Sequence, residues 1–278
     1  MKKIFKTIYY IGGTVYRGLI GIFDNLFDKE EKISNEVGRE VIGKSVKGRE
    51  ILAYKIGNGE NKLLITGGIH GNEVGTVKLA KKIINYFANK NFPPKTDQPI
   101  DENIQLFIIP VLNIDGYLQA KKNPDYMHRG KIGRFNACQV DLNRNFSTQN
   151  FKQYSEWGVG KNYSDEKIKI FCGGYGASEP ETKALINFIK NNNIKNLIML
   201  HNVGKDVIIA EDDEVAVKWA EIYEKYAKFK IRYDLGYSGG AMDWAKENNI
   251  NYMAIEGTSR WGSDWKKQQK AIIKILKN

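Results

Sequence analysis

The stretch Gly67-Gly68-Ile69-His70-Gly71-Asn72-Glu73 directly follows the apolar run Leu63-Leu64-Ile65. This order predicts a strand, a glycine-rich turn and then a helix. A His and a Glu three positions apart in such a turn can face one point and offer a nitrogen and a carboxylate oxygen to one metal ion. Catalytic zinc sites commonly take two His and one Glu from the protein and leave the fourth position to water. The stretch therefore predicts two ligands of a zinc site and requires one more His.

Histidine is scarce in this chain, which narrows the search for that ligand. The sequence contains three His residues, and His201 ends the apolar run Leu197-Ile198-Met199-Leu200. His201 is therefore the candidate for the second His of the site.

Strand-like and helical patterns alternate along the chain. Strands are expected at 51–56, 63–66, 106–111, 197–200, 207–210 and 252–255. Helices are expected at 73–89, 178–191 (opened by a Ser-x-x-Glu capping signature), 213–228 and 264–277, with a short helix after 238–240. This alternation predicts an α/β fold, a three-layer sandwich with a mixed, mostly parallel central sheet flanked by helices.

Composition and charge indicate one large soluble domain. The 278 residues are 42% apolar and 27% charged, and the formal net charge is +11. That charge suits anionic surroundings, although lysine pairs such as Lys81-Lys82 and Lys266-Lys267 also fit a solvated helix surface. No nucleic-acid motif is present, so no nucleic acid partner is expected. The two cysteines, Cys138 and Cys172, exclude a disulfide framework and a Cys-type zinc site, and they leave both a single disulfide and two buried free thiols open.

The first 27 residues differ from the rest of the chain. Met1-Lys2-Lys3 resembles the start of a signal peptide, but Lys6 and Arg17 interrupt the apolar stretch and no clean cleavage site follows. No apolar run here is long enough to span a bilayer. Read as a helix, the segment has one apolar stripe and a basic face. Such a helix can lie on an anionic membrane, pack on its own domain or contact a second subunit.

The central segment Val140-Asp141-Leu142-Asn143-Arg144-Asn145-Phe146 concentrates polar groups. The planar guanidinium of Arg144 matches a carboxylate in two-point fashion, and Asn143 can donate to the same anion. Asp141 is suited to orient a zinc-bound imidazole by accepting its second N–H. Arg134 could supply another positive charge. A surface salt bridge is the competing interpretation for each residue alone.

Glu256 follows the strand-like run Tyr252-Met253-Ala254-Ile255. An acid at a strand end is a common place for a catalytic group in an α/β protein. A structural partner for Lys or Arg is the alternative.

Taken in order, these motifs resemble the zinc metallocarboxypeptidases of the carboxypeptidase A type. The resemblance runs from about Val41 to Glu256 and rests on a series of short motifs. The motifs are His70-x-x-Glu73, Pro110-x-x-Asn113-x-Asp115-Gly116, Asp141-x-Asn143-Arg144-Asn145, His201, Ser238-Gly239-Gly240-x-x-Asp243-Trp244 and Glu256. The flanking text at 43–49 and 177–182 is closer to the bacterial branch, which includes murein tripeptide amidases that cleave the D-glutamyl–diaminopimelate bond.

The resemblance implies a single zinc ion held by His70, Glu73 and His201. It implies that Glu256 is the general base that deprotonates the attacking water and later passes the proton to the leaving amine. It also implies a three-layer carboxypeptidase-like fold for a catalytic domain at 41–278, preceded by an N-terminal extension at 1–40.

Further roles follow from the same resemblance. Asn143 and Arg144 would grip the free carboxylate of the terminal residue, which makes cleavage exo rather than endo. Asp141 would be the hydrogen-bond partner of His70. Arg134 would hold the developing oxyanion, with Arg129 as a nearby competitor.

Two positions depart from the pancreatic-type pattern. The position of the substrate-capping Tyr falls on Leu235, with Tyr233 and Tyr237 two residues to either side, and Tyr237 is the preferred candidate. The specificity position at the floor of the terminal-residue pocket falls on Met242, which is apolar and offers no acid to select Lys or Arg.

Three functions are therefore weighed. The first is a zinc metallocarboxypeptidase acting on small peptides with a free terminal carboxylate, including peptidoglycan-derived peptides. The second is a zinc deacylase of the aspartoacylase or succinylglutamate type, which shares the His-x-x-Glu motif. The third is a non-catalytic binding module, and the intact ligands and Glu256 count against it. The expected location is the cytoplasm or the cell envelope of a bacterium.

Overall fold

The computed structural model describes most of the chain, in the ranges 22–23, 26–35, 37–88, 100–124, 131–158, 167–234 and 236–277. The expectations for residues 1–21, for Arg129 and for Leu235 lie outside the described residues.

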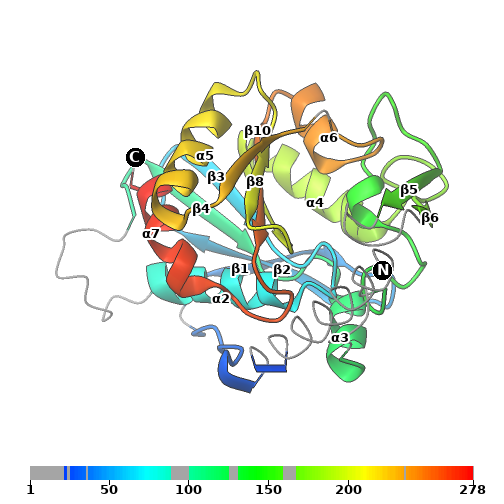
Figure 1. Cartoon of the computed structure of the whole chain (residues 1–278), viewed down its shortest axis with the longest axis horizontal. Helices are drawn as coiled ribbons and strands as arrows, with labels where there is room; N and C mark the ends of the chain where they lie inside the picture. The colour runs from blue at the N-terminus through cyan, green and yellow to red at the C-terminus, as the bar shows by residue number, and fades with distance from the viewer. Residues whose placement is uncertain are drawn as a thin grey trace, which may run out of the picture.

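An eight-stranded mixed sheet, counted over the described residues, runs through the centre of the molecule in the order β1-β2-β4-β3-β7-β10-β8-β9 (Figure 1). Its strands are β1 (Arg39–Lys44), β2 (Glu50–Ile56), β3 (Asn61–Thr66), β4 (Ile104–Ile109), β7 (Asn196–Asn202), β8 (Asp206–Ile209), β9 (Lys230–Tyr233) and β10 (Asn251–Gly257). The four neighbours β4, β3, β7 and β10 are mutually parallel, and β9 is parallel to β8. The α/β prediction with a mixed sheet is confirmed.

Helices cover both faces of this sheet (Figure 1). They are α2 (Val74–Ala88), α3 (Ile114–Lys122), α4 (Pro180–Asn191), α5 (Glu214–Ala227), α6 (Ala241–Glu247) and α7 (Trp265–Ile275). Apolar residues of α2, α5 and α7 pack in one buried cluster, and those of α4 and α6 pack in another. The two clusters lie on opposite sides of the sheet and make the three layers.

Strand alternation determines which face carries the functional residues. In β10, Met253 and Ile255 belong to the cluster under α2, α5 and α7, whereas Tyr252 and Ala254 belong to the cluster under α4 and α6. Successive side chains of a strand point to opposite faces, so Glu256 follows Tyr252 and Ala254 onto the α4–α6 face. We call this the α6 face of the sheet.

Two local details differ from the sequence-based expectation. The helix α4 begins at Pro180 with Glu179 as its N-cap, and no side-chain hydrogen bond caps it. The hydroxyl of Ser178 instead donates to the Glu179 carboxylate at 2.8 Å, so the predicted capping signature was misplaced by one residue. A separate two-stranded sheet, β5 (Tyr154–Gly158) with β6 (Lys167–Phe171), was not predicted.

The lysines of α2 are not simply solvated. Lys82 lies 3.3 Å from the Asp28 carboxylate and 3.2 Å from that of Glu31, both in the segment before β1. Lys81 pairs with Glu30 of the same segment. The interpretation of Lys81-Lys82 as a solvated surface was therefore wrong, because the two ammonium groups bind the N-terminal segment.

Glu30 makes most of these contacts. Its carboxylate accepts hydrogen bonds from Lys81, from Lys121 at 2.7 Å and from the Tyr117 hydroxyl. Burial alone would raise the pKa of Glu30, but hydrogen bonds from Lys121, Lys81 and Tyr117 outweigh it and lower the pKa to about 2. Among the described residues, no helix has the length and apolar character needed to cross a membrane.

Replacing Glu30 with Gln is expected to lower the free energy of unfolding by about 2 kcal/mol at pH 7, since hydrogen bonds to a charged acceptor are lost. The pKa of Glu30 is lower in the folded state than its ordinary value of 4.5. Its contribution is therefore complete above that value and disappears as the pH falls toward about 2. Urea unfolding of both proteins across this range tests the effect. Glu31→Gln, at a more exposed carboxylate, is the control and should change stability less. An E30Q difference that persists unchanged at low pH would contradict the role of the charge.

Candidate metal centre and substrate site

The turn between β3 and α2 places His70 and Glu73 at the carboxyl edge of the parallel strands. Gly68 adopts a positive φ of 61°, which favours glycine. A Cβ on Gly71 would lie 2.1 Å from the backbone nitrogen of Tyr117, so the turn passes against the start of α3 only because this residue has no side chain. The Thr76 hydroxyl donates to the Glu73 carbonyl at 2.7 Å and accepts from the Gly68 amide at 3.0 Å. The turn is thus held at both ends.

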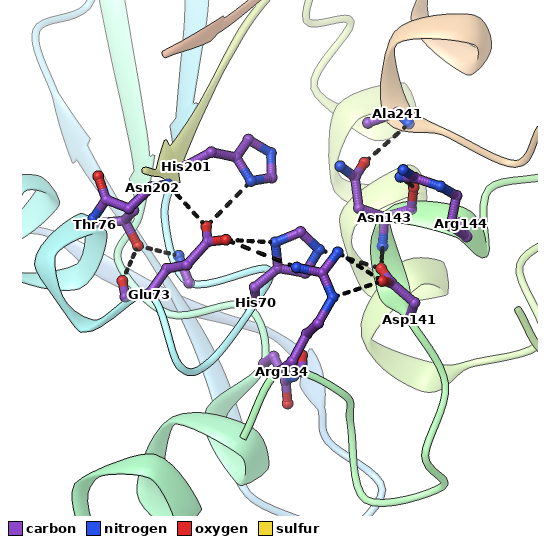
Figure 2. Close-up of polar contacts among 12 residues, drawn as sticks. His70, Glu73, Thr76, Arg134, Asp141, Asn143, Arg144, His201, Asn202 and Ala241 are labelled. Atoms are coloured by element: carbon purple, nitrogen blue, oxygen red, sulfur yellow. Dashed lines mark hydrogen bonds and ion pairs between the residues drawn. The ribbon is translucent and has the colours of Figure 1, made fainter. Parts of the chain in front are cut away.

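Three side chains converge at this edge (Figure 2). The Nδ1 atom of His70 lies 2.9 Å from Oε1 of Glu73, and the Nδ1 atom of His201 lies 3.3 Å from Oε2. His201 comes from β7, the neighbour of β3 in the sheet. All three residues are buried, and their ligand atoms lie within 4.8 Å of one another. The sequence-predicted set is brought together and could hold a metal ion.

The donor chemistry of this group fits zinc. Two imidazole nitrogens and one carboxylate match the common zinc set, and ligand atoms of a tetrahedral zinc ion stand about 3.4 Å apart. The two observed separations, 2.9 and 3.3 Å, are close to that spacing. Burial alone would raise the pKa of Glu73, but the His70 charge and hydrogen bonds from His201 and His70 hold it far below its usual range. Glu73 is therefore held as the carboxylate that a cation requires.

Asp141 connects His70 to the next motif. Its Oδ1 lies 3.2 Å from Nε2 of His70, as expected for a carboxylate that orients a ligating imidazole. Arg134 donates to Oδ2 through Nε at 3.0 Å and lies 2.8 Å away through Nη2. Its Nη1 lies 4.0 Å from Glu73, so the guanidinium stands between the two carboxylates (Figure 2).

The segment after Asp141 forms a short 3₁₀ turn, Leu142–Arg144, that presents Asn143 and Arg144. The Oδ1 atom of Asn143 accepts from the amide of Ala241 at 3.2 Å. Arg144 donates through Nη1 to the Asn143 carbonyl at 2.7 Å. Its Nε is buried and has no hydrogen-bond partner among the residues that the structure describes. A buried cation with an unused donor is suited to an anionic ligand.

The two pocket candidates lie beside this cation. The ring of Tyr237 stacks on the Arg144 guanidinium, 4.2 Å from ring centre to carbon, and the residue is half exposed. Met242, in the first turn of α6, is buried in the apolar cluster of the α6 face. Tyr233 is also exposed, at the end of β9. The stacking on Arg144 favours Tyr237 over Tyr233 as the substrate-capping residue.

Glu256 lies one strand away from the metal candidates. In the parallel pairing of β10 with β7 it stands opposite His201. Burial raises the pKa of Glu256 to about 7, the charge of His201 opposes this, and the carboxylates of Glu73 and Asp206 add to it. A carboxyl group with a pKa near neutrality is well matched to proton transfer.

Some contacts at this centre were not predicted from the sequence. The backbone amide of Asn202 donates to Oε2 of Glu73 at 3.1 Å, a contact that carries no side-chain signal. Cys138 and Cys172 are both free thiols, so no disulfide joins them. Cys172 is buried, as the free-thiol alternative expected, whereas Cys138 is exposed.

Comparison with known families assigns this arrangement. The family model for zinc carboxypeptidases, Peptidase_M14, matches residues 24–218. The chain belongs to the zinc carboxypeptidase family. The match covers the turn, the central segment and His201, while Glu256 lies beyond it and is placed by the sheet register.

Curated relatives of this chain are similar over most of its length. It is 26% identical to human carboxypeptidase B over 254 residues, which is 81% of this chain and 59% of the relative. It is 26% identical to rat mast cell carboxypeptidase A over 247 residues, 80% of this chain and 58% of the relative. The chain thus spans about three fifths of the length of these relatives.

Solved structures share the fold. Murein-tripeptide amidase MpaA from Escherichia coli O157 superposes with a TM-score of 0.65 at 18% identity, covering 90% of this chain and 93% of that one. Bovine thrombin-activatable fibrinolysis inhibitor, in complex with tick carboxypeptidase inhibitor, superposes with a TM-score of 0.67 at 22% identity, covering 87% of this chain and 90% of that one. The carboxypeptidase-like architecture predicted from the motifs is confirmed.

Zinc is expected to raise the melting temperature of the metal-free protein by several degrees, because an ion that binds only the folded state stabilises it by mass action. Chelation followed by zinc addition, read by calorimetry, tests this. His201→Ala should lose the shift, whereas His128→Ala, at the remaining His of the sequence, should keep it. An equal shift in His201→Ala would exclude His201 from the metal site.

Proposed function

We propose that this protein is a zinc-dependent metallocarboxypeptidase that hydrolyses the C-terminal peptide or amide bond of small peptides. The proposed substrates include peptidoglycan-derived peptides, in which the bond cleaved is the D-glutamyl–diaminopimelate bond. One observation carries the proposal. Glu256 stands opposite the candidate metal ligand His201 in the sheet, and the turn that carries Arg144 begins at Asp141, which contacts the candidate ligand His70. A metal centre, a base and a carboxylate grip are the three parts that exopeptidase chemistry needs.

In this proposal His70, Glu73 and His201 hold one zinc ion. When bound, zinc supplies Lewis acidity, which lowers the pKa of water and polarises a carbonyl. Asp141 keeps His70 in the ligating tautomer by accepting its Nε2 proton.

Glu256 acts as the general base. It takes a proton from the attacking water and passes it to the leaving amine as the bond breaks. Its position opposite His201, beside the candidate metal ligands and outside that set, supports this role.

The terminal carboxylate of the substrate is assigned to Arg144 and Asn143, with Tyr237 stacked over the guanidinium. The unused Nε of Arg144 supports this role. Arg134 is assigned to the developing oxyanion. Its charge stands 4.0 Å from Glu73, and two of its nitrogens are held by Asp141, which keeps it in place. Met242 is assigned to the terminal-residue pocket.

The proposed role of Arg144 requires a substrate with a free C-terminal carboxylate. The zinc-loaded protein is expected to release the last residue from peptides with a free terminal carboxylate and to leave amidated peptides intact, since only the former engage Arg144. Mass spectrometry of L-Ala-γ-D-Glu-meso-diaminopimelate beside ordinary peptides, with and without chelator, measures this. Activity confined to N-acyl amino acids would instead indicate a deacylase.

Two variants complete that test. Glu256→Gln should bind zinc normally but lower kcat by about 10²- to 10⁴-fold, the usual contribution of a general base. Arg144→Ala should raise KM for free-carboxylate peptides. Loss of zinc in Glu256→Gln would mean that this residue is structural, and equal rates on amidated and free peptides would remove the role of Arg144.

We further propose that residues 1–40 form an extension to a catalytic domain at 41–278, and that residues 1–27 contact a membrane surface. In the described part of this segment, residues 22–23 and 26–27, the four apolar side chains are exposed, among them Phe23 at 61% and Phe27 at 70%. Their rings lie 4.3 Å apart, and Ile22 and Leu26 are exposed beside them. Exposed apolar groups in a segment whose sequence also contains Lys2, Lys3, Lys6 and Arg17 fit an anionic lipid surface.

Co-sedimentation with vesicles of phosphatidylglycerol is expected to exceed that with phosphatidylcholine and to weaken in high salt. The double variant Phe23→Ser/Phe27→Ser should lose binding, while Tyr175→Ser, at an aromatic residue of similar exposure, should retain it. Equal binding by all three proteins would place the contact elsewhere.

A further inference from the structure

A polar pair lies next to Glu256 on the α6 face and belongs to none of the roles above. In the antiparallel pairing of β10 with β8, Glu256 stands opposite Asp206. In the parallel pairing of β8 with β9, Ile208 stands opposite Arg232. Directly opposite residues of neighbouring strands share a face. Asp206 and Arg232 therefore project from the same face as Glu256.

The surroundings of this pair include the terminal-residue pocket candidate. Ile208 packs against the apolar cluster that contains Met242, Tyr252 and Ala254. Along β8, the apolar residues of the α6 face thus end at the carboxylate of Asp206. A side chain resting on these residues would reach a charged group at its far end.

Asp206 is satisfied on one oxygen only. It is 8% exposed, and its Oδ2 accepts from Nη1 of Arg232 at 3.0 Å. Its Oδ1 is buried without a hydrogen-bond partner among the described residues. A Cβ added at Gly204 would meet Oδ1 at 2.5 Å and the Glu256 Cβ at 2.8 Å, so Oδ1 faces the Glu256 side. A buried carboxylate oxygen without a donor destabilises the protein, and a donor group on a ligand would remove that cost.

Arg232 complements that acceptor. Its side chain is 51% exposed, and a guanidinium has five N–H donors, of which the bond to Asp206 uses one. The remaining Arg232 donors are therefore available to a second anionic group.

We propose that Asp206 and Arg232 determine specificity for a terminal residue whose side chain itself ends in an amino-acid group, with the ammonium bound by Asp206 Oδ1 and the carboxylate by Arg232. A diamino dicarboxylic acid such as diaminopimelate is the matching class. The inference rests on the proposed function for the placement of the substrate's other carboxylate at Arg144. Asp206 and Arg232 would supply the polar contacts to the substrate side chain that the apolar Met242 cannot make.

The test uses three peptides, L-Ala-γ-D-Glu-X, in which X is meso-diaminopimelate, Lys or Leu. Wild-type protein should favour diaminopimelate. Asp206→Asn should lower kcat/KM for the diaminopimelate and Lys peptides by about 10- to 100-fold through KM, the range of a charged hydrogen bond. It should lower kcat/KM for the Leu peptide less, because only the effect of Asp206 on the pKa of Glu256 is lost there. Arg232→Met, at a half-exposed residue, should lower kcat/KM for the diaminopimelate peptide alone. Asp212→Asn, at an exposed carboxylate paired with Lys246 at 2.7 Å, is the matched control and should change none.

Two outcomes would overturn the proposal. One is an equal loss on all three peptides in Asp206→Asn, which would show that the residue acts through Glu256. The other is no selective loss in either variant. Calorimetric binding of free meso-diaminopimelate to the zinc-loaded proteins gives a second readout. If the peptides are hydrolysed and neither variant selectively loses activity on diaminopimelate, the specificity role of Asp206 and Arg232 is wrong and the proposed peptidase function stands. If no peptide is hydrolysed but the variants bind free diaminopimelate more weakly than wild type, the peptidase function is wrong and the binding role of Asp206 and Arg232 stands.

Discussion

One buried carboxylate, that of Asp141, organises the whole site. It is fully buried, and its two oxygens accept from His70, from the backbone amide of Asn143 and from the guanidinium of Arg134. Burial would raise its pKa, but Arg134 and His70 hold it well below the usual value. A buried charge is tolerated only when its partners are complete. The turn after β3, the loop that carries Arg134 and the turn that carries Arg144 are therefore held to one another.

The sheet supplies the second constraint. His70 and Glu73, His201 and Glu256 come from segments far apart in sequence, yet they follow or end the adjacent parallel strands β3, β7 and β10. The carboxyl ends of neighbouring parallel strands meet at one edge, which is where α/β proteins place ligands. The register that pairs Glu256 with His201 also pairs it with Asp206, so a single strand brings the base to both neighbours.

The fold class and the candidate metal ligands could be predicted from the sequence, because the patterns that indicate them are local. His70-x-x-Glu73 sits between an apolar run and a helical period, and His201 and Glu256 each end an apolar run. The pair of Asp206 and Arg232 gives no such signal, since it depends on the register of β8 against β9. The binding of Lys81 and Lys82 by the segment before β1 was missed for the same reason: both partners read alone as ordinary surface charges. Ser178 shows the limit of a local signature, because Pro180 opens the helix and shifts the cap to Glu179.

The start of α6 binds the central segment through backbone atoms of residues 239 and 241. The amide of Ala241 bonds Asn143, the Gly239 carbonyl accepts from the Phe146 amide at 2.9 Å, and a Cβ at Gly239 would lie 2.1 Å from the Arg144 carbonyl. None of these contacts involves the side chain of residue 242. A substitution at position 242 therefore leaves these anchoring contacts in place and changes only the packing of the apolar cluster around it, so the pocket candidate and the carboxylate anchor can vary separately.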